Sequence, residues 1–211
     1  MKPNYLVHDD IYVEIRKQGF NGWGGNQRLL NAQLIDRFFE IDQPLPLGQL
    51  LELGCGEGHH CRAFSERGYE TFGIDISPTA IEWAREKSQS FGISGHYSVG
   101  DLTQPNYQFE TEFDVVIDGN CLHCIIDDDR SIFLNNVNKA LKPNGVFFVS
   151  SLCTSEAESY LTYRNGLPYR QITTANELEV ELAEAGLKLL SKRVFQRKGH
   201  CHITAHAIKA R

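Results

Sequence analysis

Hydrophobic and polar positions follow two different periods along the chain, and their alternation predicts a mixed α/β architecture. Residues 49–53 are a short, mostly apolar run with the length of a buried strand, and residues 71–75, 96–99 and 113–118 also read as strands. Between them lie segments in which apolar residues recur at helical spacing. The apolar residues Val-Phe-Phe-Val at 146–149, within the segment 140–149, continue the series. Strands that alternate with helices indicate a parallel sheet with crossover helices.

The N-terminal part of the chain has a helical pattern of its own. Residues 26–41 carry apolar side chains, among them Leu34 and Phe38, on one helix face. We therefore expect one domain overall, in which residues 1–47 form a helical segment or lid that packs on a core of residues 48–211.

The C-terminal part predicts a helix and two strands. Residues 174–177 form a capping-box pattern that opens a helix. Residues 187–195 and 201–209 read as strands joined by residues 196–200, a connection that suits an antiparallel pair and is too short for a parallel crossover. The expected sheet has seven strands and is mostly parallel, with one antiparallel strand near the C-terminus.

Three alternating glycines directly follow the run at 49–53. The segment reads Leu51-Glu52-Leu53-Gly54-Cys55-Gly56-Glu57-Gly58, and a helical stretch comes after it. Such a turn lets the backbone approach a ligand closely and aims the free N–H groups of the helix at that ligand. The segment therefore predicts a nucleotide-binding turn.

The charges around this turn favour a cationic ligand. Glu52 and Glu57 lie in it, and Lys and Arg are absent from it until Arg62. A pyrophosphate is a poor guest between two carboxylates, and the glycine spacing departs from the G-x-G-x-x-G of dinucleotide-binding proteins. S-adenosylmethionine, with its sulfonium and ammonium, fits these charges.

These motifs resemble, in order, those of the class I S-adenosylmethionine-dependent methyltransferases. Besides the glycine turn, the chain has Asp75 at the end of a strand, Gly100-Asp101-Leu102 after the next, and Phe113 to Asp118 as a fourth. Residues 141–145, Leu-Lys-Pro-Asn-Gly, resemble the family's L-K-P-G-G turn, with Asn144 in place of its first glycine. The resemblance is strong over residues 48–150 and weaker to residue 211, and it implies a Rossmann-like, doubly wound sheet.

The resemblance also implies a set of cofactor-binding residues. In the family, an acid at the place of Asp75 accepts hydrogen bonds from the ribose hydroxyls, and one at the place of Asp101 accepts from the adenine amino group. Taken alone, each is equally an ordinary turn or cap acid. Trp23, in the glycine-rich residues 20–25, is expected either to shield the cofactor as part of a lid or to lie in the core. The expected cofactor-binding residues are Glu52, Gly54, Cys55, Gly56 and Gly58 at the methionine end, Asp75, Ile76, Asp101 and Leu102 at the ribose and adenine, Asp118, Gly119 and Asn120 under the sulfonium, and Trp23.

Candidates for contact with the acceptor follow the fourth and fifth strands. His123 is the candidate base, because imidazole titrates near neutrality, and its alternative is a hydrogen-bonded packing histidine. Residues 156–171 lie where the resembled family often builds its acceptor pocket, and they include Tyr160, Tyr163, Arg164, Tyr169 and Arg170. Tyrosines there could wall an apolar substrate and an arginine could hold a carboxylate, and the alternative is a surface loop with exposed arginines. Cys153 is a further candidate for the acceptor site.

Cysteine and histidine clusters raise two further hypotheses, redox chemistry and metal binding. Cys121-Leu122-His123-Cys124 is formally a C-x-x-C motif, but the rest of the chain does not resemble a thioredoxin. Cysteine often serves as a small buried apolar residue, so we expect no metal site. We expect His200, His202 and His206 to line a solvated strand face.

The bulk composition limits the partners. The 211 residues carry a formal net charge of −6, which argues against an electrostatic grip on nucleic acid. No run of 18 apolar residues occurs, and residues 1–10 do not form the apolar stretch of a signal peptide, so we expect a cytoplasmic protein and no membrane partner.

The sequence thus predicts a methyltransferase that uses S-adenosyl-L-methionine and acts on a small-molecule acceptor. Two alternatives stay open: a nicotinamide-dependent oxidoreductase, and a non-catalytic cofactor-binding protein of the same fold. Asp118-Gly119-Asn120-Cys121 does not match the D/N-P-P-Y motif of amino-group methylases. The acceptor, the methylated atom and the oligomeric state stay undetermined by the sequence.

Overall fold

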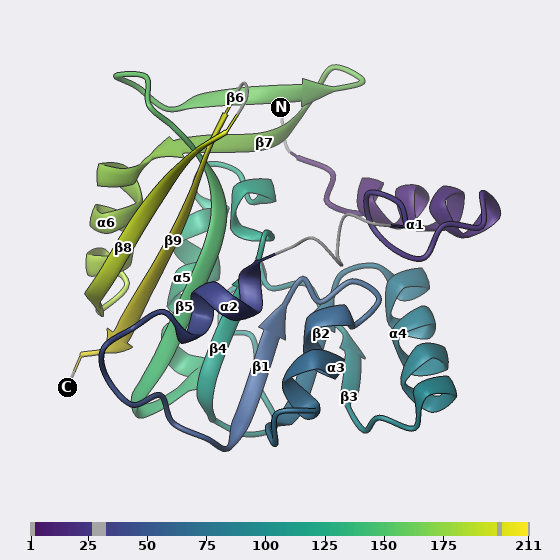
Figure 1. Ribbon diagram of the computed structural model, residues 1–211. Coiled ribbons are helices and arrows are strands. Elements are labelled where there is room, and N and C mark those ends of the chain that lie inside the picture. Colours follow the sequence, from purple (N-terminus) through teal and green to yellow (C-terminus); the bar gives the residue numbers. More distant parts are fainter. Residues whose placement is uncertain (1–2, 27–32, 198–199, 211) are drawn as a thin grey trace.

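The computed structural model describes residues 3–26, 33–197 and 200–210, which form one central sheet flanked by helices (Figure 1). The helices are α1 (Val7–Lys17), α2 (Leu34–Phe39), α3 (His59–Ser65), α4 (Pro78–Phe91), the 3₁₀ turn η1 (Leu122–Cys124), α5 (Asp129–Ala140) and α6 (Ala175–Glu184). The strands are β1 (Gln49–Leu53), β2 (Glu70–Asp75), β3 (His96–Val99), β4 (Phe113–Gly119), β5 (Leu141–Thr154), β6 (Tyr160–Arg164), β7 (Leu167–Thr174), β8 (Leu187–Arg197) and β9 (His200–Lys209).

The main sheet has the predicted doubly wound arrangement. Strands β3, β2, β1, β4 and β5 lie side by side in that order and are parallel. β9 runs antiparallel along β5, and β8 pairs with the outer edge of β9. The prediction of a mostly parallel sheet with one antiparallel strand near the C-terminus is confirmed, and the strand order reverses between β1 and β4.

The hairpin of β6 and β7 adds two strands that the apolar pattern did not predict. Its two-residue turn is Asn165-Gly166, and both residues have positive φ, 51° and 77°. Asn-Gly is the preferred pair for such a turn, so the sequence did contain a local signal for the hairpin. β7 joins the end of β5 through only two paired positions, Cys153 with Thr173 and Thr154 with Thr174.

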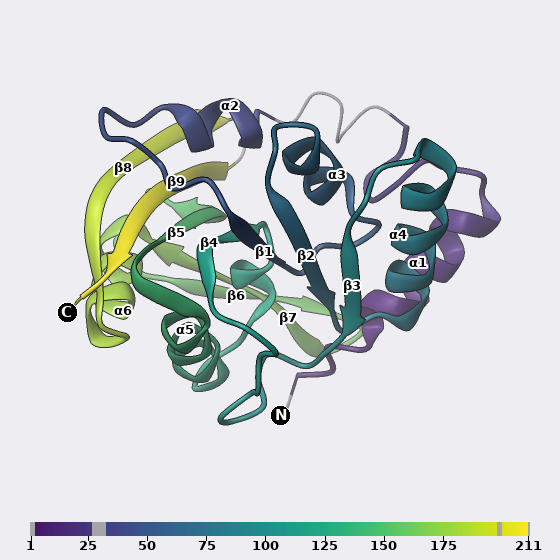
Figure 2. The same ribbon diagram turned by 90° about the horizontal axis from the view of Figure 1, so that it is seen from below.

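Adjacent residues of the central strands face opposite layers of helices. Leu50, Val115 and Phe148 pack with α2 and α3, whereas their neighbours Leu51, Val116 and Phe147 pack with α5 and α6. Figure 2 shows the two layers on either side of the sheet. Continuous apolar runs are the pattern of strands buried on both faces, which explains why the sequence marked these strands so clearly.

Helix α1 docks on helix α4. Oδ1 of Asp9 accepts hydrogen bonds from Ser77 Oγ at 2.6 Å and from the backbone N–H of Thr79 at 3.0 Å, so it binds the first turn of α4. Tyr12 packs between the two helices against Trp83. The helix predicted at 26–41 includes α2, and residues 27–32 lie outside the described residues.

The prediction that the C-terminal histidines line a solvated face is wrong for His202 and His206, which are buried. The His206 ring lies 2.8 Å from the carbonyl of Phe38 through Nε2 and 2.9 Å from Ser191 Oγ through Nδ1. β9 lies between β5 and β8 rather than at an edge, and α2 covers this face of it. The side chain of His200 lies outside the described residues.

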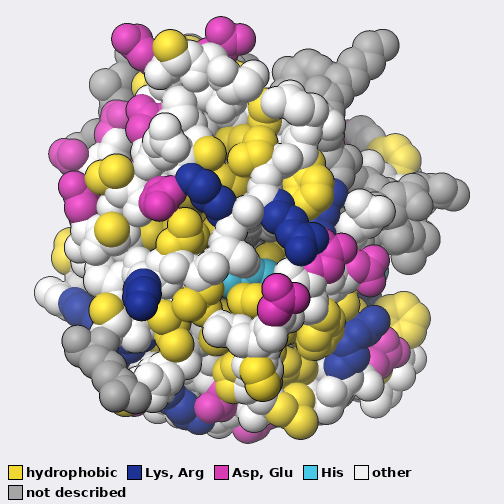
Figure 3. Space-filling view, turned by 60° about the vertical axis from the view of Figure 1, so that its left-hand side comes forward, with side chains coloured by type: hydrophobic (Ala, Val, Ile, Leu, Met, Phe, Trp, Pro, Cys, Tyr) yellow, Lys and Arg dark blue, Asp and Glu magenta, His cyan; other side chains and the backbone are white. Residues whose placement is uncertain are grey.

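Charged and apolar groups are mixed on the surface. On the face seen in Figure 3, Lys and Arg side chains lie among Asp, Glu and hydrophobic side chains. Within the described ranges, no helix has the length and apolar character needed to cross a bilayer.

Candidate functional site

A cavity of about 190 Å³ lies at the carboxyl ends of β1, β2 and β4, where the strand order reverses. This is where open parallel sheets bind their ligands. Its wall comes from the glycine turn, the strand ends, η1, helix α1 and strand β7. The lining residues are Tyr5, His8, Tyr12, Trp23, Glu52, Gly54, Cys55, Gly56, Glu57, His59, His60, Asp75, Ile76, Gly100, Asp101, Leu102, Thr103, Gly119, Asn120, Cys121, His123, Cys124, Ile125, Phe133 and Arg170.

The glycine turn needs glycine for both backbone and space. Gly54 and Gly56 have φ of 62° and 54°, a conformation that side chains disfavour. A Cβ on Gly54 would lie 2.7 Å from that of Cys121, and one on Gly56 would overlap the hydroxyl of Tyr12. Gly58, also expected at the cofactor, does not line the cavity and instead caps the start of α3.

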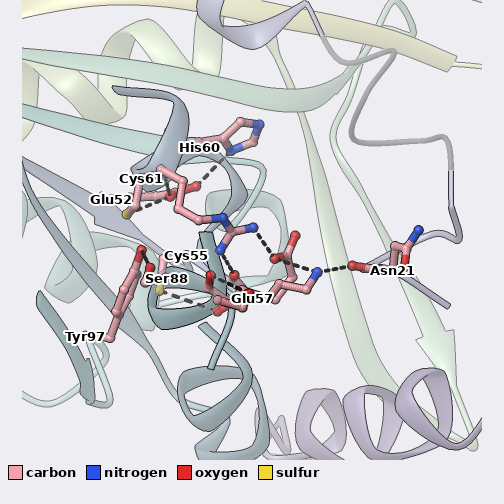
Figure 4. A network of polar contacts seen from close by, with 12 residues as sticks. Asn21, Glu52, Cys55, Glu57, His60, Cys61, Ser88 and Tyr97 are labelled. Carbon is pink, nitrogen blue, oxygen red and sulfur yellow. Dashed lines mark hydrogen bonds and ion pairs between the residues drawn. The ribbon is translucent and has the colours of Figure 1, made fainter. Parts of the chain in front are cut away.

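Behind the turn, Glu52 is buried and receives three contacts. His60 Nδ1 lies 2.8 Å from its Oε1, while the backbone N–H and the thiol of Cys61 both lie 3.1 Å from its Oε2 (Figure 4). The other ring nitrogen of His60, Nε2, is buried and has no hydrogen-bond partner among the described residues. Since His60 lines the cavity, the described residues leave one ring nitrogen at the cavity wall, Nε2, without a hydrogen bond.

A second buried carboxylate connects the turn to the N-terminal segment. Oε2 of Glu57 lies 2.6 Å from Arg62 Nη2 and 3.0 Å from Lys87 Nζ. Lys87 Nζ also donates to the carbonyl of Asn21, in the loop that carries Trp23 (Figure 4). The ring of Trp23 packs 5.1 Å from that of Tyr12 and 5.8 Å from that of His8 and lines the cavity, which is the position expected of a lid.

Asp75 ends β2 inside the cavity. Its Oδ2 accepts from the N–H of Gly56 and its Oδ1 from the N–H of Ser77, each at 2.9 Å. Burial raises the pKa of Asp75 to about 6, despite these two hydrogen bonds. The carboxylate thus fixes the glycine turn and keeps lone pairs for further donors. Its neighbour Ile76 lines the cavity as expected.

Asp101 and Leu102 also line the cavity, after β3. Oδ1 of Asp101 accepts from the N–H and the hydroxyl of Thr103, at 3.0 and 2.6 Å. Oδ2 accepts from the side chain of Gln104 at 2.8 Å. These are the contacts of a turn acid, which is the alternative that the sequence left open. Asp101 also lies at the cavity wall, where a cofactor-binding acid is expected.

At the end of β4, only two of the three expected residues reach the cavity. Gly119 and Asn120 line it, and Asn120 Oδ1 lies 2.8 Å from His202 Nε2. Asp118 does not line it, because side chains alternate along a strand and that of Asp118 points to the other face. Its Oδ1 accepts from the N–H groups of Cys121 and Leu122, at 2.7 and 3.0 Å. Burial raises the pKa of Asp118 to about 7.

His123 lies on η1, is buried and lines the cavity. Its Nδ1 lies 3.4 Å from the hydroxyl of Ser151 and from the N–H of Leu152. The position suits the base expected from the sequence, and the contacts suit a packed, hydrogen-bonded histidine, so both readings stay predictions.

The other candidates for the acceptor lie elsewhere. Cys153 is buried in the sheet, paired across strands with Cys201. Tyr160 and Tyr163 are 45% and 64% exposed, and Arg164 is exposed as well. None of these four lines the cavity. Of the hairpin that follows β5, strand β7 reaches the cavity, through Arg170.

Sequence reasoning missed several lining residues. Tyr5, His8 and Tyr12 come from α1 and the residues before it. They reach the cavity through the docking of α1 on α4, which is a tertiary contact without a local sequence signal. Arg170, on β7, is the one aromatic or basic candidate from residues 156–171 that lines the cavity.

The C-x-x-C cysteines do not have the features of a redox pair. Burial raises the pKa of Cys124 to about 11 and that of Cys121 well above its usual value, whereas redox-active cysteines have a lowered pKa. Both are free thiols. Across the described part of the chain, no three His, Cys, Asp or Glu residues are grouped as metal ligands.

The residues present fit S-adenosylmethionine. Glu52, Asp75 and Asp101 supply negative charge and acceptors for a cationic group and for hydroxyl or amino donors. Gly54 and Gly56 form a cradle that side chains would fill, and His60, whose Nε2 has no partner among the described residues, lines the same cavity.

The chain is similar to methyltransferases in sequence and in structure. Residues 51–149 match the family model described as a methyltransferase domain. A ubiquinone biosynthesis O-methyltransferase of Brucella anthropi is 28% identical over 155 residues, which are 68% of this chain and 61% of that relative. An uncharacterized methyltransferase of Schizosaccharomyces pombe is 26% identical over 139 residues, covering 64% of this chain and 95% of the relative.

Two solved structures show the same fold over nearly the whole chain. The 1,6-didemethyltoxoflavin-N1-methyltransferase of Burkholderia thailandensis has a TM-score of 0.75 and 20% identity, covering 98% of this chain and 88% of that one. The [4+2]-cyclase SpnF also has a TM-score of 0.75, with 18% identity, covering 99% and 97%. At these identities the likeness shows the fold alone. Together with the family match, it shows that residues 51–149 form a methyltransferase domain, in a chain that has the fold of these solved structures.

Proposed function

We propose that this chain transfers a methyl group from S-adenosyl-L-methionine to a small-molecule acceptor. The observation that carries the proposal is the cavity at the switch point of the sheet, where the glycine cradle meets the buried carboxylates of Glu52 and Asp75. A cationic cofactor is stabilised in this surrounding.

Each part of the cofactor has a counterpart among the lining residues. The backbone of Gly54 to Gly56, with His60 behind it, would hold the methionine end. Asp75 would accept from the ribose hydroxyls, and Asp101 with Leu102 would hold the adenine. Trp23 and Tyr12 would cover the cofactor and keep water out.

The cofactor supplies an activated methyl group on a sulfonium, so the protein mainly has to position the acceptor. Gly119, Asn120 and His123 lie beside the cradle and would face the reacting atoms. His123 would take a proton from an acceptor whose nucleophilic atom must lose one.

The proposal includes a cytoplasmic location and no nucleic-acid partner. The net charge of −6 and the mixed charges on the face of Figure 3 support the latter.

Thermal unfolding with added ligands tests the cofactor. S-adenosylhomocysteine at saturating concentration is expected to raise the Tm, because a ligand that binds only the folded state stabilises it, and NADH is expected to leave the Tm unchanged. A rise with NADH alone would indicate the oxidoreductase alternative, and no rise with either ligand would overturn the proposal. Methyl transfer to a small acceptor from labelled S-adenosylmethionine then separates an enzyme from a non-catalytic binder.

A further inference from the structure

The charged residues of the cavity are separated by sign. The carboxylates of Glu52, Asp75 and Asp101 come from β1, β2 and the end of β3, on one side of the sheet. Among the lining residues Arg170 is the single Lys or Arg, and it comes from β7, beyond β5 on the other side. The end of the cavity away from the cofactor cradle is therefore cationic.

Arg170 lacks the carboxylate partner that buried arginines usually have. It is half-buried, and no Asp or Glu of the described residues lies within ion-pair distance of it. Its Nε is buried without a hydrogen-bond partner in the same part of the chain. By contrast, the buried arginines Arg62 and Arg130 are paired with Glu57 and Glu181 at 2.6 Å.

The remaining contacts of Arg170 are weak ones. Its guanidinium lies 4.9 Å from the ring centre of Tyr169, and it contacts the thiol of Cys124. Neither group neutralises the charge. A guanidinium at a cavity wall without a carboxylate partner is suited to a carboxylate or a similar oxyanion, which guanidinium groups bind through two parallel N–H···O bonds.

Flat rings lie beside Arg170. His8 and Trp23 line the cavity, with ring centres 5.8 Å apart. Tyr169 does not line it but stacks on His8 at 5.5 Å with 19° between the ring planes. Burial and the charges of Arg170 and Arg164 lower the pKa of His8, so its ring is neutral near pH 7 and adds no competing charge. Aromatic walls of this kind favour a planar ligand.

We propose that the methyl acceptor is a small planar molecule with a carboxylate or similar oxyanion, and that Arg170 binds this anion while the rings of His8 and Trp23, which line the cavity, contact the planar part. The proposal rests on the proposed function and narrows its acceptor to one chemical class.

Binding of two matched probes to the protein saturated with S-adenosylhomocysteine tests the proposal. The probes are 3,4-dihydroxybenzoate and 3,4-dihydroxybenzamide, which share the ring and differ in charge, and calorimetry gives their affinities. The wild-type protein is expected to bind the benzoate at least about tenfold more tightly, because a charge-assisted pair is made only with the anion.

Three variants assign the preference to Arg170. Arg170→Gln is expected to abolish it, and Arg170→Lys, which keeps the charge but not the fork, is expected to retain part of it. Arg193→Gln removes an equal charge from an exposed residue paired with Glu40, and it is expected to keep the full preference. The Tm rise with S-adenosylhomocysteine serves as the folding control for each variant.

The outcomes separate this inference from the proposed function. If S-adenosylhomocysteine raises the Tm but the wild-type protein does not bind the benzoate, or binds both probes equally, the anionic acceptor is wrong and the methyltransferase stands. If Arg170→Gln keeps the preference, Arg170 is not its source and the proposal is overturned. If S-adenosylhomocysteine does not bind, the proposed function fails, and this inference fails with it.

Discussion

His60 Nδ1 lies 2.8 Å from Oε1 of Glu52, and both side chains are buried behind the glycine turn. The other ring nitrogen, Nε2, has no hydrogen-bond partner within the described ranges. Because His60 lines the cavity, we expect this ring to contribute a polar contact to the bound cofactor.

Replacement of His60 tests this contact. His60→Phe keeps an aromatic ring and removes both ring nitrogens, and it is expected to weaken S-adenosylhomocysteine binding by about 1–3 kcal/mol in calorimetry. His96→Phe changes an exposed histidine outside the cavity and should leave the affinity unchanged. Equal affinities of the two variants would refute the role of His60.

Asp75 is expected to accept hydrogen bonds from the ribose hydroxyls of the cofactor. Asp75→Ala should weaken S-adenosylhomocysteine binding by about 2 kcal/mol, because two charge-assisted hydrogen bonds are lost. With a pKa of about 6, the wild-type carboxyl is protonated below that pH, so affinity should fall as the pH drops through 6. This pH dependence should be weaker in Asp75→Ala, and Asp36→Ala, an exposed control, should behave as the wild type. A steep fall in Asp75→Ala would assign the titration to another group.

Asp118 should make the fold less stable as the pH rises. Its pKa is 3.8 in the unfolded reference and about 7 in the fold, so the native state binds the extra proton between these values. The free energy of unfolding therefore falls with rising pH across this window, by roughly 4 kcal/mol at most. Denaturant titrations at pH 4.5 and pH 8 should show a smaller fall for Asp118→Asn than for the wild type. Asp42→Asn, at an exposed position, should match the wild type; a slope unchanged in Asp118→Asn would contradict the prediction.

Gly56 is expected to tolerate no side chain. Gly56→Ala adds about 1–2 kcal/mol of backbone strain and forces the Tyr12 hydroxyl aside, so both the Tm and the S-adenosylhomocysteine affinity should fall. The double variant with Tyr12→Phe should regain part of the affinity, because the overlapping hydroxyl is gone. Gly92→Ala has the same kind of backbone, with φ of 65° and open space around it, and should lower the Tm alone. If Gly92→Ala also weakens S-adenosylhomocysteine binding, general destabilisation of the fold explains the result for Gly56→Ala, and the prediction is wrong.

The strands and the cofactor cradle could be predicted because their signals are local. Apolar runs such as 113–118 indicate strands that are buried on both faces. The three alternating glycines indicate the turn, because glycine readily adopts a positive φ. Asp118 was misplaced because a one-residue step along a strand turns a side chain to the other face, and the motif does not fix that step. Tyr12 could not be predicted, since it reaches the cavity through the docking of α1 on α4. Arg170 was within the predicted stretch 156–171, but the sequence could not tell that it, rather than Arg164, would reach the cavity.

The hairpin of β6 and β7 is attached to the sheet by two paired positions at the tip of β5, yet it supplies Arg170 to the cavity. The five parallel strands and the cradle do not depend on it for their pairing. A hairpin with so few sheet contacts can lengthen, shorten or be replaced during evolution while the parallel strands and the glycine turn stay intact. Descendants of one ancestral enzyme can thus diverge in the molecules they modify through changes confined to a single loop-like insert.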